Sequence, residues 1–376
     1  MKRAFFLILA LILFAVPAFA KAAPLSPMLS ADGSHILALD ASGNVWAWGS
    51  NHRGESVPGK TDERILSPEI VFENALSITS GQQFSMAIDE NSRLYAWGDN
   101  REKQIFASAD EKVLSPVMLM ENVVYADACD TTAACVTKDG KCWLWGGGTD
   151  KILVSENAEK CEVGMNFAVI LEKDGRVFER TLTETESKLM ISNAKDISAS
   201  GESRYALSED GTLYAWGAAA SDGRLAISGG IRYIETPERI CQNADISSMI
   251  AGLTFSGFLT SANELYLWGT LYSYASYIDE TGTVQAALVD GALLSYGSEP
   301  IRLYENVKSA AVGDAFIALL FESGDIFTWG SNDQGQLGNG KYTQIALVEA
   351  EDDEGYEAEI ISSADSVFPN VPITLK

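Results

Sequence analysis

The sequence predicts an all-β fold, a seven-bladed β-propeller of four-stranded antiparallel blades, and three observations point to it. All eight tryptophans fall inside one recurring motif, and six of them stand in a Trp-Gly pair. The motif occurs seven times, and each copy pairs a turn signal with apolar runs on both sides. Each repeating unit is long enough to hold about four short strands. Radial stacking of such units in a ring removes exposed strand edges.

The repeat can be read in register by taking its Trp position as zero. The seven zero positions are Trp48, Trp97, Trp145, Arg180, Trp216, Trp268 and Trp329. The position two residues earlier is aromatic in every copy: Trp46, Tyr95, Trp143, Phe178, Tyr214, Tyr266 and Phe327. The positions three and nine residues earlier are apolar in every copy. Because the copy at Arg180 keeps this spacing, we interpret it as a true repeat that lost its Trp.

Each copy is expected to contain a tight hairpin. Five residues before the zero position stand Gly43, Ser92, Gly140, Gly175, Gly211, Asn263 and Gly324. Three of these glycines follow an Asp, and Asp-Gly between apolar runs is a strong hairpin signal because such turns need positive φ. Adjacent apolar residues on the second strand of the hairpin indicate that both faces are buried, as in stacked sheets. An Asn recurs 23 residues before most zero positions and marks where each unit begins.

The most complete copy carries the family resemblance. Trp329-Gly330-Ser331-Asn332 followed by Gly335-Gln336-Leu337-Gly338 resembles the signature of the regulator of chromosome condensation repeat family. The resemblance covers about residues 30–348 and implies a seven-bladed β-propeller. Family relatives include a nuclear exchange factor for a small GTPase and a secreted bacterial β-lactamase inhibitor. The Gly-Gln-Leu-Gly loop is lost after Trp48 and Trp97, so the chain looks like a divergent, secreted bacterial-type relative.

Residues 1–20 have the pattern of a secretory signal peptide. Lys2 and Arg3 precede an apolar run of 13 residues, and Ala18-Phe19-Ala20 forms a cleavage site. The run is too short to cross a bilayer, and no second stretch of spanning length follows. We therefore expect an exported protein, secreted or extracytoplasmic, with no transmembrane segment. Residues 21–376 are predicted to form a single propeller domain, with repeats at about 30–348 and a closing segment at about 349–376.

The closing segment is expected to complete the first blade. By the spacing of the repeat, the proline that starts the outer strand of that blade would fall at position 19, which is Phe19 and lies inside the predicted signal peptide. The sequence from Tyr356 to Phe368 is similar in pattern to the sequence from Tyr304 to Phe316. The sequence therefore predicts that the C-terminal segment closes the ring by completing the blade that holds Trp46 and Trp48.

Composition limits the partners and cofactors. Without Lys2 and Arg3, 25 basic residues stand against 52 acidic ones, a net charge of −27 that repels nucleic acid. Five cysteines leave at least one thiol unpaired within a monomer, and none forms a C-x-x-C pair. We expect packed thiols or an incidental disulfide, and we assign no metal and no cofactor. The five cysteines are Cys129, Cys135, Cys142, Cys161 and Cys241.

One segment between repeats is much longer than the others. Thr270 to Glu299, after Trp268, contains Tyr272, Tyr274, Tyr277 and Tyr296 together with several serines. Tyrosine with serine supplies large contact area at small entropic cost, as in antibody paratopes. These four tyrosines are the candidate binding residues. The alternative is that they pack the extra length onto the neighbouring blade.

The leading functional hypothesis is an exported, non-enzymatic scaffold that engages a protein or a cell-envelope polymer through propeller loops. Only two histidines are present, and neither G-x-S-x-G nor H-E-x-x-H occurs, so we assign no catalytic residue. Two other hypotheses remain open. One is a carbohydrate-active propeller enzyme that uses paired carboxylates at the ring centre. The other is a structural surface module.

Overall fold

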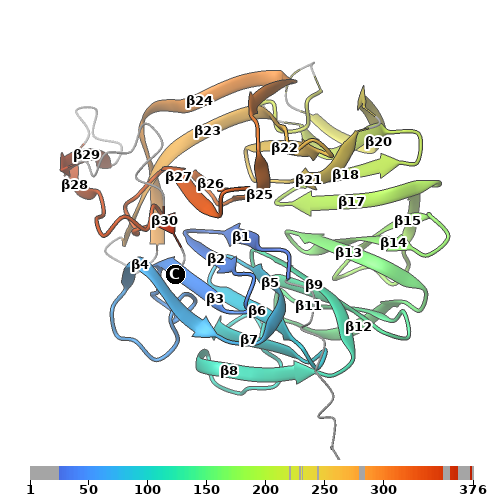
Figure 1. Ribbon diagram of the computed structural model, residues 1–376, viewed down its shortest axis with the longest axis horizontal. Coiled ribbons are helices and arrows are strands. Elements are labelled where there is room, and N and C mark those ends of the chain that lie inside the picture. The colour runs from blue at the N-terminus through green and yellow to red at the C-terminus, as the bar shows by residue number, and fades with distance from the viewer. Residues whose placement is uncertain are drawn as a thin grey trace, which may run out of the picture.

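The computed structural model contains seven four-stranded antiparallel sheets arranged as the blades of a ring (Figure 1). It describes residues 25–219, 222–227, 230, 232–243, 245–278, 284–349, 356–362 and 373–374; for strand segments including 271–296, 344–349, 356–362 and 373–374 it describes the backbone alone. The predicted signal peptide lies outside the described residues. Within these ranges, no helix is long and apolar enough to cross a membrane.

The strands follow one another from the ring centre outward in each blade. Blade 1 contains β1 (Met28–Asp32), β2 (His35–Leu39), β3 (Val45–Ser50) and β4 (Arg64–Phe72). Blade 2 contains β5 (Ala75–Ser80), β6 (Phe84–Asp89), β7 (Leu94–Asp99) and β8 (Lys112–Met120). Blade 3 contains β9 (Val123–Cys129), β10 (Thr132–Thr137), β11 (Cys142–Gly146) and β12 (Thr149–Ser155). Blade 4 contains β13 (Ala158–Gly164), β14 (Phe167–Glu172), β15 (Val177–Thr181) and β16 (Lys188–Ile191).

The remaining blades follow the same order, except at the end of the chain. Blade 5 contains β17 (Ala194–Ser200), β18 (Ser203–Ser208), β19 (Thr212–Ala219) and β20 (Arg232–Gln242). Blade 6 contains β21 (Ile246–Ile250), β22 (Phe255–Thr260), β23 (Leu265–Ile278) and β24 (Val284–Tyr304). Blade 7 contains β25 (Val307–Val312), β26 (Phe316–Phe321), β27 (Asp325–Gly330) and β30 (Ile373–Thr374). A separate hairpin pairs β28 (Gln344–Glu349) with β29 (Tyr356–Ser362).

The predicted hairpin joins the second and third strands of every blade. The residue five before the zero position has positive φ in all seven copies, and this includes Ser92 at 62° and Asn263 at 58°. The turn carbonyl then accepts a hydrogen bond from the next blade, as in Ala75 N to Gly43 O at 2.9 Å. The turns therefore shape each blade and also link it to its neighbour. The second strand is buried along its whole length in most blades, as expected for stacked sheets.

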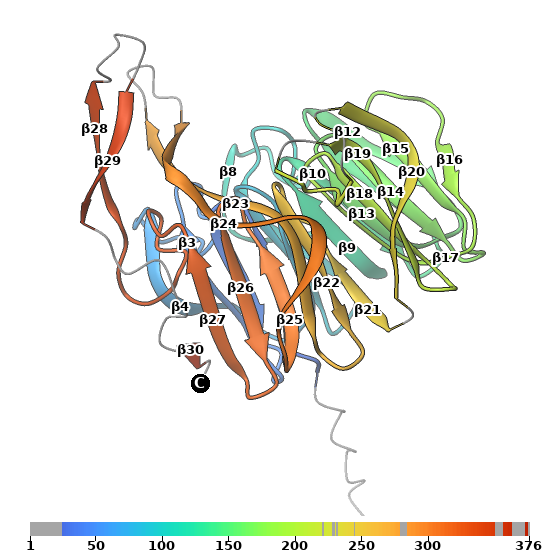
Figure 2. The same ribbon diagram turned by 90° about the horizontal axis from the view of Figure 1, so that it is seen from above.

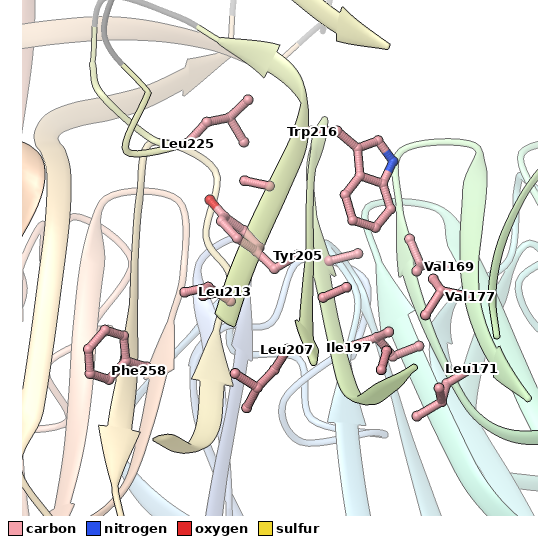
Figure 3. Packing of buried hydrophobic residues seen from close by; sticks show 14 of the residues in the cluster. Val169, Leu171, Val177, Ile197, Tyr205, Leu207, Leu213, Trp216, Leu225 and Phe258 are labelled. Atoms are coloured by element: carbon pink, nitrogen blue, oxygen red, sulfur yellow. The ribbon is translucent and has the colours of Figure 1, made fainter. Parts of the chain in front are cut away.

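The six tryptophans at the zero position are buried in the contacts between blades. Figure 3 shows this for Trp216, which lies beside Val169 and Val177 of blade 4, while Phe258 lies on the other side of blade 5. All five cysteines are free thiols, and all except Cys241 are buried. The core thus runs around the ring as a series of apolar layers between adjacent blades.

The predicted way of closing the ring is wrong in its detail. The blade with Trp46 and Trp48 takes its inner strand from β1, which pairs with β2 from Met28 opposite Leu39 to Asp32 opposite His35. Its outer strand is β4, which contains Pro68. This strand pairs with β3, the strand before it that holds Trp46 and Trp48, and not with the unit that follows it. Blade 1 therefore has all four of its strands without the C-terminal segment. That segment contributes β30 to blade 7 instead, where Ile373 lies opposite Ile326.

The first and last blades are joined by the loop after Trp329. The indole Nε1 of Trp48 donates to the carbonyl of Gln336 at 2.9 Å, and Arg64 Nε donates to the carbonyl of Asp333 at 2.9 Å. The loop is rigid because its own side chains bind its backbone: Asn332 Oδ1 accepts from the amide of Leu337 at 3.0 Å. Leu337 is fully buried. The best-preserved copy of the motif is thus the part that closes the ring.

The closing contact can be tested with two variants. Trp48→Ala is expected to lower the free energy of unfolding by about 3–5 kcal/mol, the usual penalty for removing a buried large side chain. Removal of residues 356–376 should cost less than this, because β30 adds only two residue pairs to blade 7. Urea denaturation followed by tryptophan fluorescence measures both. A truncated chain that unfolds completely would show that the C-terminal segment, and not the Trp48 contact, closes the ring.

Candidate functional site on the loop face

One face of the ring carries all the variable segments, and we call it the loop face. It contains the short turns between the first and second strands of each blade and the segments between the third and fourth strands. The antiparallel order places both kinds of connection at the same end, as in the pairing of His35 with Gly49. The opposite face carries the regular hairpins. Since loops on a rigid scaffold most often carry function, the loop face is the candidate site.

The loop face is uneven around the ring. In blade 3 the third and fourth strands are joined by only Gly147 and Gly148, and in blade 4 by the six residues 182–187. In blade 6 the same connection becomes a two-stranded ribbon, in which β23 and β24 stay paired from Gly269 opposite Gly297 to Ile278 opposite Val284. The face is therefore low over blades 3 and 4 and high over blade 6.

The segment expected to be a loop, Thr270 to Glu299, is mostly this ribbon. Pairing continues past the blade because each strand supplies a long run of residues without a proline to interrupt it. Figure 2 shows the ribbon projecting from the ring beside the hairpin of β28 and β29. The strand β24 contacts β29, so the two projections form one raised region.

The four candidate tyrosines all belong to the ribbon. Tyr272, Tyr274 and Tyr277 lie in β23, where they pair with Ala292, Leu288 and Gln285. Tyr296 lies in β24. Their side chains lie outside what the structure describes. The backbone thus places the four residues on one projecting element, and their role in binding stays a prediction.

A narrow cavity of about 170 Å³ follows the axis of the ring and is lined by the inner strands of all seven blades. Two carboxylates line it from the neighbouring blades 3 and 4. Asp127 accepts from the amide of Val163 at 2.8 Å and from Thr79 Oγ1 at 3.2 Å. Glu162 is bound by the hydroxyl of Tyr125 and by Lys160 Nζ at 3.1 Å. Burial and then the charge of Glu162 raise the pKa of Asp127 well above its ordinary value.

A second group of carboxylates lies at the end of this cavity on the loop face. Asp32 accepts from the amides of Gly33 at 2.7 Å and Asp130 at 2.6 Å, which connects blades 1 and 3 across the mouth. Burial and then the charge of Asp314 raise the pKa of Asp32 to about 8. Burial and then Asp130 raise the pKa of Asp314 to about 6. Asp32 of blade 1 thus accepts a hydrogen bond from blade 3, so its first role is to hold the ring centre together.

A third feature is a polar pocket of about 240 Å³ between blades 2 and 3, also on the loop face. Arg101 lies in it, with Nε 2.8 Å from Asp99 Oδ1 and an Nη 3.0 Å from Gln83 Oε1. Because Asp99 already balances the charge of Arg101, the pocket offers mainly hydrogen-bonding groups. Sequence reasoning missed the pocket, and it raised paired carboxylates at the ring centre without naming them, since the residues come from different blades and no local pattern joins them.

Geometry and comparisons together define the class of this protein, which is a seven-bladed β-propeller built from one repeat. Two models of the regulator of chromosome condensation (RCC1) repeat match it, one at residues 323–349 and the other at residues 32–55 and 76–104. The chain therefore contains RCC1 repeats.

Two curated relatives show how far the similarity extends. The secretion-regulating guanine nucleotide exchange factor of Bos taurus is 26% identical over 226 residues, covering 52% of this chain and 44% of the relative. The X-linked retinitis pigmentosa GTPase regulator of Mus musculus is 36% identical over 76 residues, covering 19% and 8%. The matches thus span less than half the length of each of these relatives.

Two solved structures share the fold. Prp20p of Saccharomyces cerevisiae matches with a TM-score of 0.67 and 17% identity, covering 87% of each chain. Human WBSCR16 matches with a TM-score of 0.66 and 15% identity, covering 89% of this chain and 94% of that one. At such low identity these likenesses establish the architecture alone.

The raised pKa values of Asp32 and Asp314, at the loop-face end of the axial cavity, predict that the stability of the fold depends on pH. The pKa of Asp32 rises from about 4 in the unfolded chain to about 8 in the folded one, so the folded state holds an extra proton across this window. Stability is therefore expected to fall as pH rises from about 5 to 8. Asp32→Asn should flatten this fall, as measured by urea denaturation at several pH values.

The matched control is Asp139→Asn, on the opposite face. Hydrogen bonds from Lys141 and Thr137 lower the pKa of Asp139 to about 2, which is outside the window. This variant should keep the wild-type slope between pH 5 and 8. An equal slope in Asp32→Asn and wild type would contradict the role given to Asp32.

Proposed function

We propose that this protein is a non-enzymatic scaffold that binds a protein partner through its loop face. The observation that carries the proposal is the raised region over blades 6 and 7, where the connection between the third and fourth strands of blade 6 is a long ribbon and a further hairpin lies beside it. In the described backbone, the ribbon strands pair only with each other beyond the blade. Such strands offer backbone donors and acceptors along their edges, which suits recognition of an extended segment.

The relatives support protein binding. The bovine relative is named as an exchange factor, and the yeast structure of Prp20p comes with its binding properties to Gsp1p and histones. Those partners belong to those proteins. For this chain, the signal-like residues 1–20 favour an extracytoplasmic partner, either a protein or a cell-envelope polymer, and we favour a protein because of the family. A net charge of −25 for the whole chain argues against nucleic acid.

A second candidate function is a carbohydrate-active enzyme, because the ring centre does contain neighbouring carboxylates. Asp127 with its raised pKa has the protonation of a general acid, and Glu162 could serve as its partner. However, Asp127 already accepts hydrogen bonds from blades 2 and 4, and Glu162 is bound by Tyr125 and Lys160. These contacts are those of structural groups, so the scaffold is the stronger proposal.

The face used for binding can be mapped by photo-crosslinking. A benzoylphenylalanine would replace Gln82 or Glu202 on the loop face, and Asn91 or Glu209 on the opposite face; all four are exposed. The protein expressed in its native organism should form partner adducts from the first pair and not from the second, as identified by mass spectrometry. Adducts formed equally from both faces would contradict the proposal.

The ribbon can be tested in the same experiment. Replacing residues 272–293 with Asn-Gly closes a tight hairpin after the pair Leu271–Leu294. The melting temperature should stay within about 2 °C of wild type, since the blade below is intact, and the loop-face adducts should be lost. Adducts that survive the replacement would show that the ribbon is not part of the binding surface.

The enzyme alternative has its own assay. Purified protein and Asp127→Asn would be incubated with panels of glycans and peptidoglycan, and reducing ends would be measured. We expect no turnover from either. Turnover that Asp127→Asn abolishes in a variant with unchanged melting would replace the scaffold proposal with the enzyme.

A further inference from the structure

Two cysteines occupy positions of the repeat that face each other across neighbouring blades. One position lies three residues before the zero position, and the other lies four residues after the recurring Asn of the next unit. In four pairs of neighbouring blades both positions belong to one apolar cluster: Val45 with Ile78, Leu94 with Ala126, Val177 with Ile197 and Leu265 with Ala310. Figure 3 shows Val177 and Ile197 close together between blades 4 and 5. Between blades 3 and 4 the same two positions hold Cys142 and Cys161.

The two thiols are in contact between the blades. Both side chains are fully buried, in a cluster that also contains Val136 and Ala158. The hydrogen bond between the two thiols, and then burial, raise the pKa of Cys161 well above its ordinary value. The structure holds both residues as free thiols. Two cysteines whose thiols are in contact can be bridged with little movement of the backbone.

The other three cysteines have different neighbours. Cys129 lines the axial cavity, where its Sγ accepts from the amide of Gly201 at 3.3 Å. Cys135 belongs to the cluster shared with blade 2, and its Sγ lies 3.7 Å from the Sδ of Met120. Cys241 lies in β20, the outer strand of blade 5. The geometry therefore selects Cys142 and Cys161 as the pair that can be bridged.

This pair crosses an interface that lacks the usual contact between blades. At four other interfaces the zero-position indole donates its N–H to a backbone carbonyl of the preceding blade: Trp48 to Gln336, Trp97 to Glu55, Trp145 to Gln104 and Trp268 to Arg224. In blades 3 and 4, whose residues are all described, the zero position of blade 4 is Arg180, which has no indole. The connection of blade 3 that would supply the carbonyl is only Gly147 and Gly148. The facing cysteines thus lie where a non-covalent link is absent.

We propose that Cys142 and Cys161 form a disulfide that joins blades 3 and 4 under the oxidising conditions outside the cytoplasm. The covalent bond takes over at this interface the role that the indole contact has at the others. The inference goes beyond the proposed binding function. It rests on the export expected from residues 1–20, because disulfides persist mainly in oxidising compartments.

The oxidant is the disulfide of a thiol-oxidising protein in that compartment. The thiolate of one cysteine attacks this disulfide, so that a mixed disulfide forms and one thiolate of the oxidising protein leaves. The thiolate of the other cysteine then attacks the sulfur of the first, which forms the Sγ–Sγ bond and releases the second thiolate. Two thiols of the chain are oxidised, the oxidising protein gains two thiols, and the two protons pass to these thiols. Because both cysteines are buried in the folded ring, this exchange precedes the packing of blade 4 on blade 3.

The direct test is to refold the denatured full chain in a mixture of oxidised and reduced glutathione. Free thiols are then alkylated under denaturing conditions, and the chain is digested with trypsin. Cleavage after lysine places Cys142 and Cys161 in separate peptides, residues 142–151 and 161–173. We expect mass spectrometry to find these two peptides linked as the main product, with the other three cysteines alkylated. Five alkylated cysteines, or a main product that links another pair, would overturn the inference.

Thermal melting tests whether the bond joins the blades. Closing the loop from Cys142 to Cys161 should raise the melting temperature by about 4 °C over chain refolded with dithiothreitol. The double variant Cys142→Val with Cys161→Ile copies the pair found between blades 4 and 5, so it should fold. It should give no linked peptide and should melt at one temperature with and without dithiothreitol.

The matched control is Cys135→Ala, which removes a buried thiol from the neighbouring cluster. This variant should keep both the linked peptides and the shift of about 4 °C. A wild-type melting temperature that does not depend on dithiothreitol would overturn the role of the bond in joining the blades. Neither measurement depends on what the loop face binds, so failure here leaves the scaffold proposal standing.

Discussion

The hydrogen bond from a tryptophan indole to a loop of the preceding blade is the contact on which the ring depends. For Trp48, Trp97, Trp145 and Trp268, the indole fills the apolar layer between two blades and donates its N–H to a backbone carbonyl of the preceding blade. A blade cannot shift sideways without leaving both groups unpaired in a dry environment, which is costly. The contact from Trp48 to Gln336 applies the same rule to the first and last blades and so closes the ring.

Departures from this contact coincide with the unusual features of the loop face. Where the loop is clipped, blade 4 carries Arg180, and blade 5 satisfies Trp216 with the carboxylate of Glu179. Where the loop is replaced by the ribbon, Trp329 Nε1 has no acceptor in the described part of the chain. The low side and the high side of the loop face thus both arise where the connection between the third and fourth strands of a blade differs from that of the other blades. A partner that contacts both sides would recognise the asymmetry of the ring.

The axial carboxylates show how an acidic chain can still form a compact centre. Asp32 and Asp127 each accept backbone amides from other blades, and burial keeps them protonated at higher pH than usual. Neutral carboxyl groups avoid the repulsion that ionised ones would cause inside a narrow channel. The same groups that made a catalytic hypothesis reasonable therefore serve the architecture.

The repeat, the hairpin turns and the number of blades could all be predicted from the sequence. They depend on local chemistry, such as positive φ at Gly43 or Ser92 and the pattern of apolar residues, which neighbours in the chain already express. The unusual segment after Trp268 was also located, but its pairing as a ribbon, which joins residues as close in the chain as Ile278 and Val284, was not predicted. Three features emerged only from tertiary contacts: which strand completes which blade, which carboxylates meet at the axis, and which loop carbonyl accepts from which indole. Each of these depends on contacts between blades, where the partner residues are far apart in the chain and no local pattern records them.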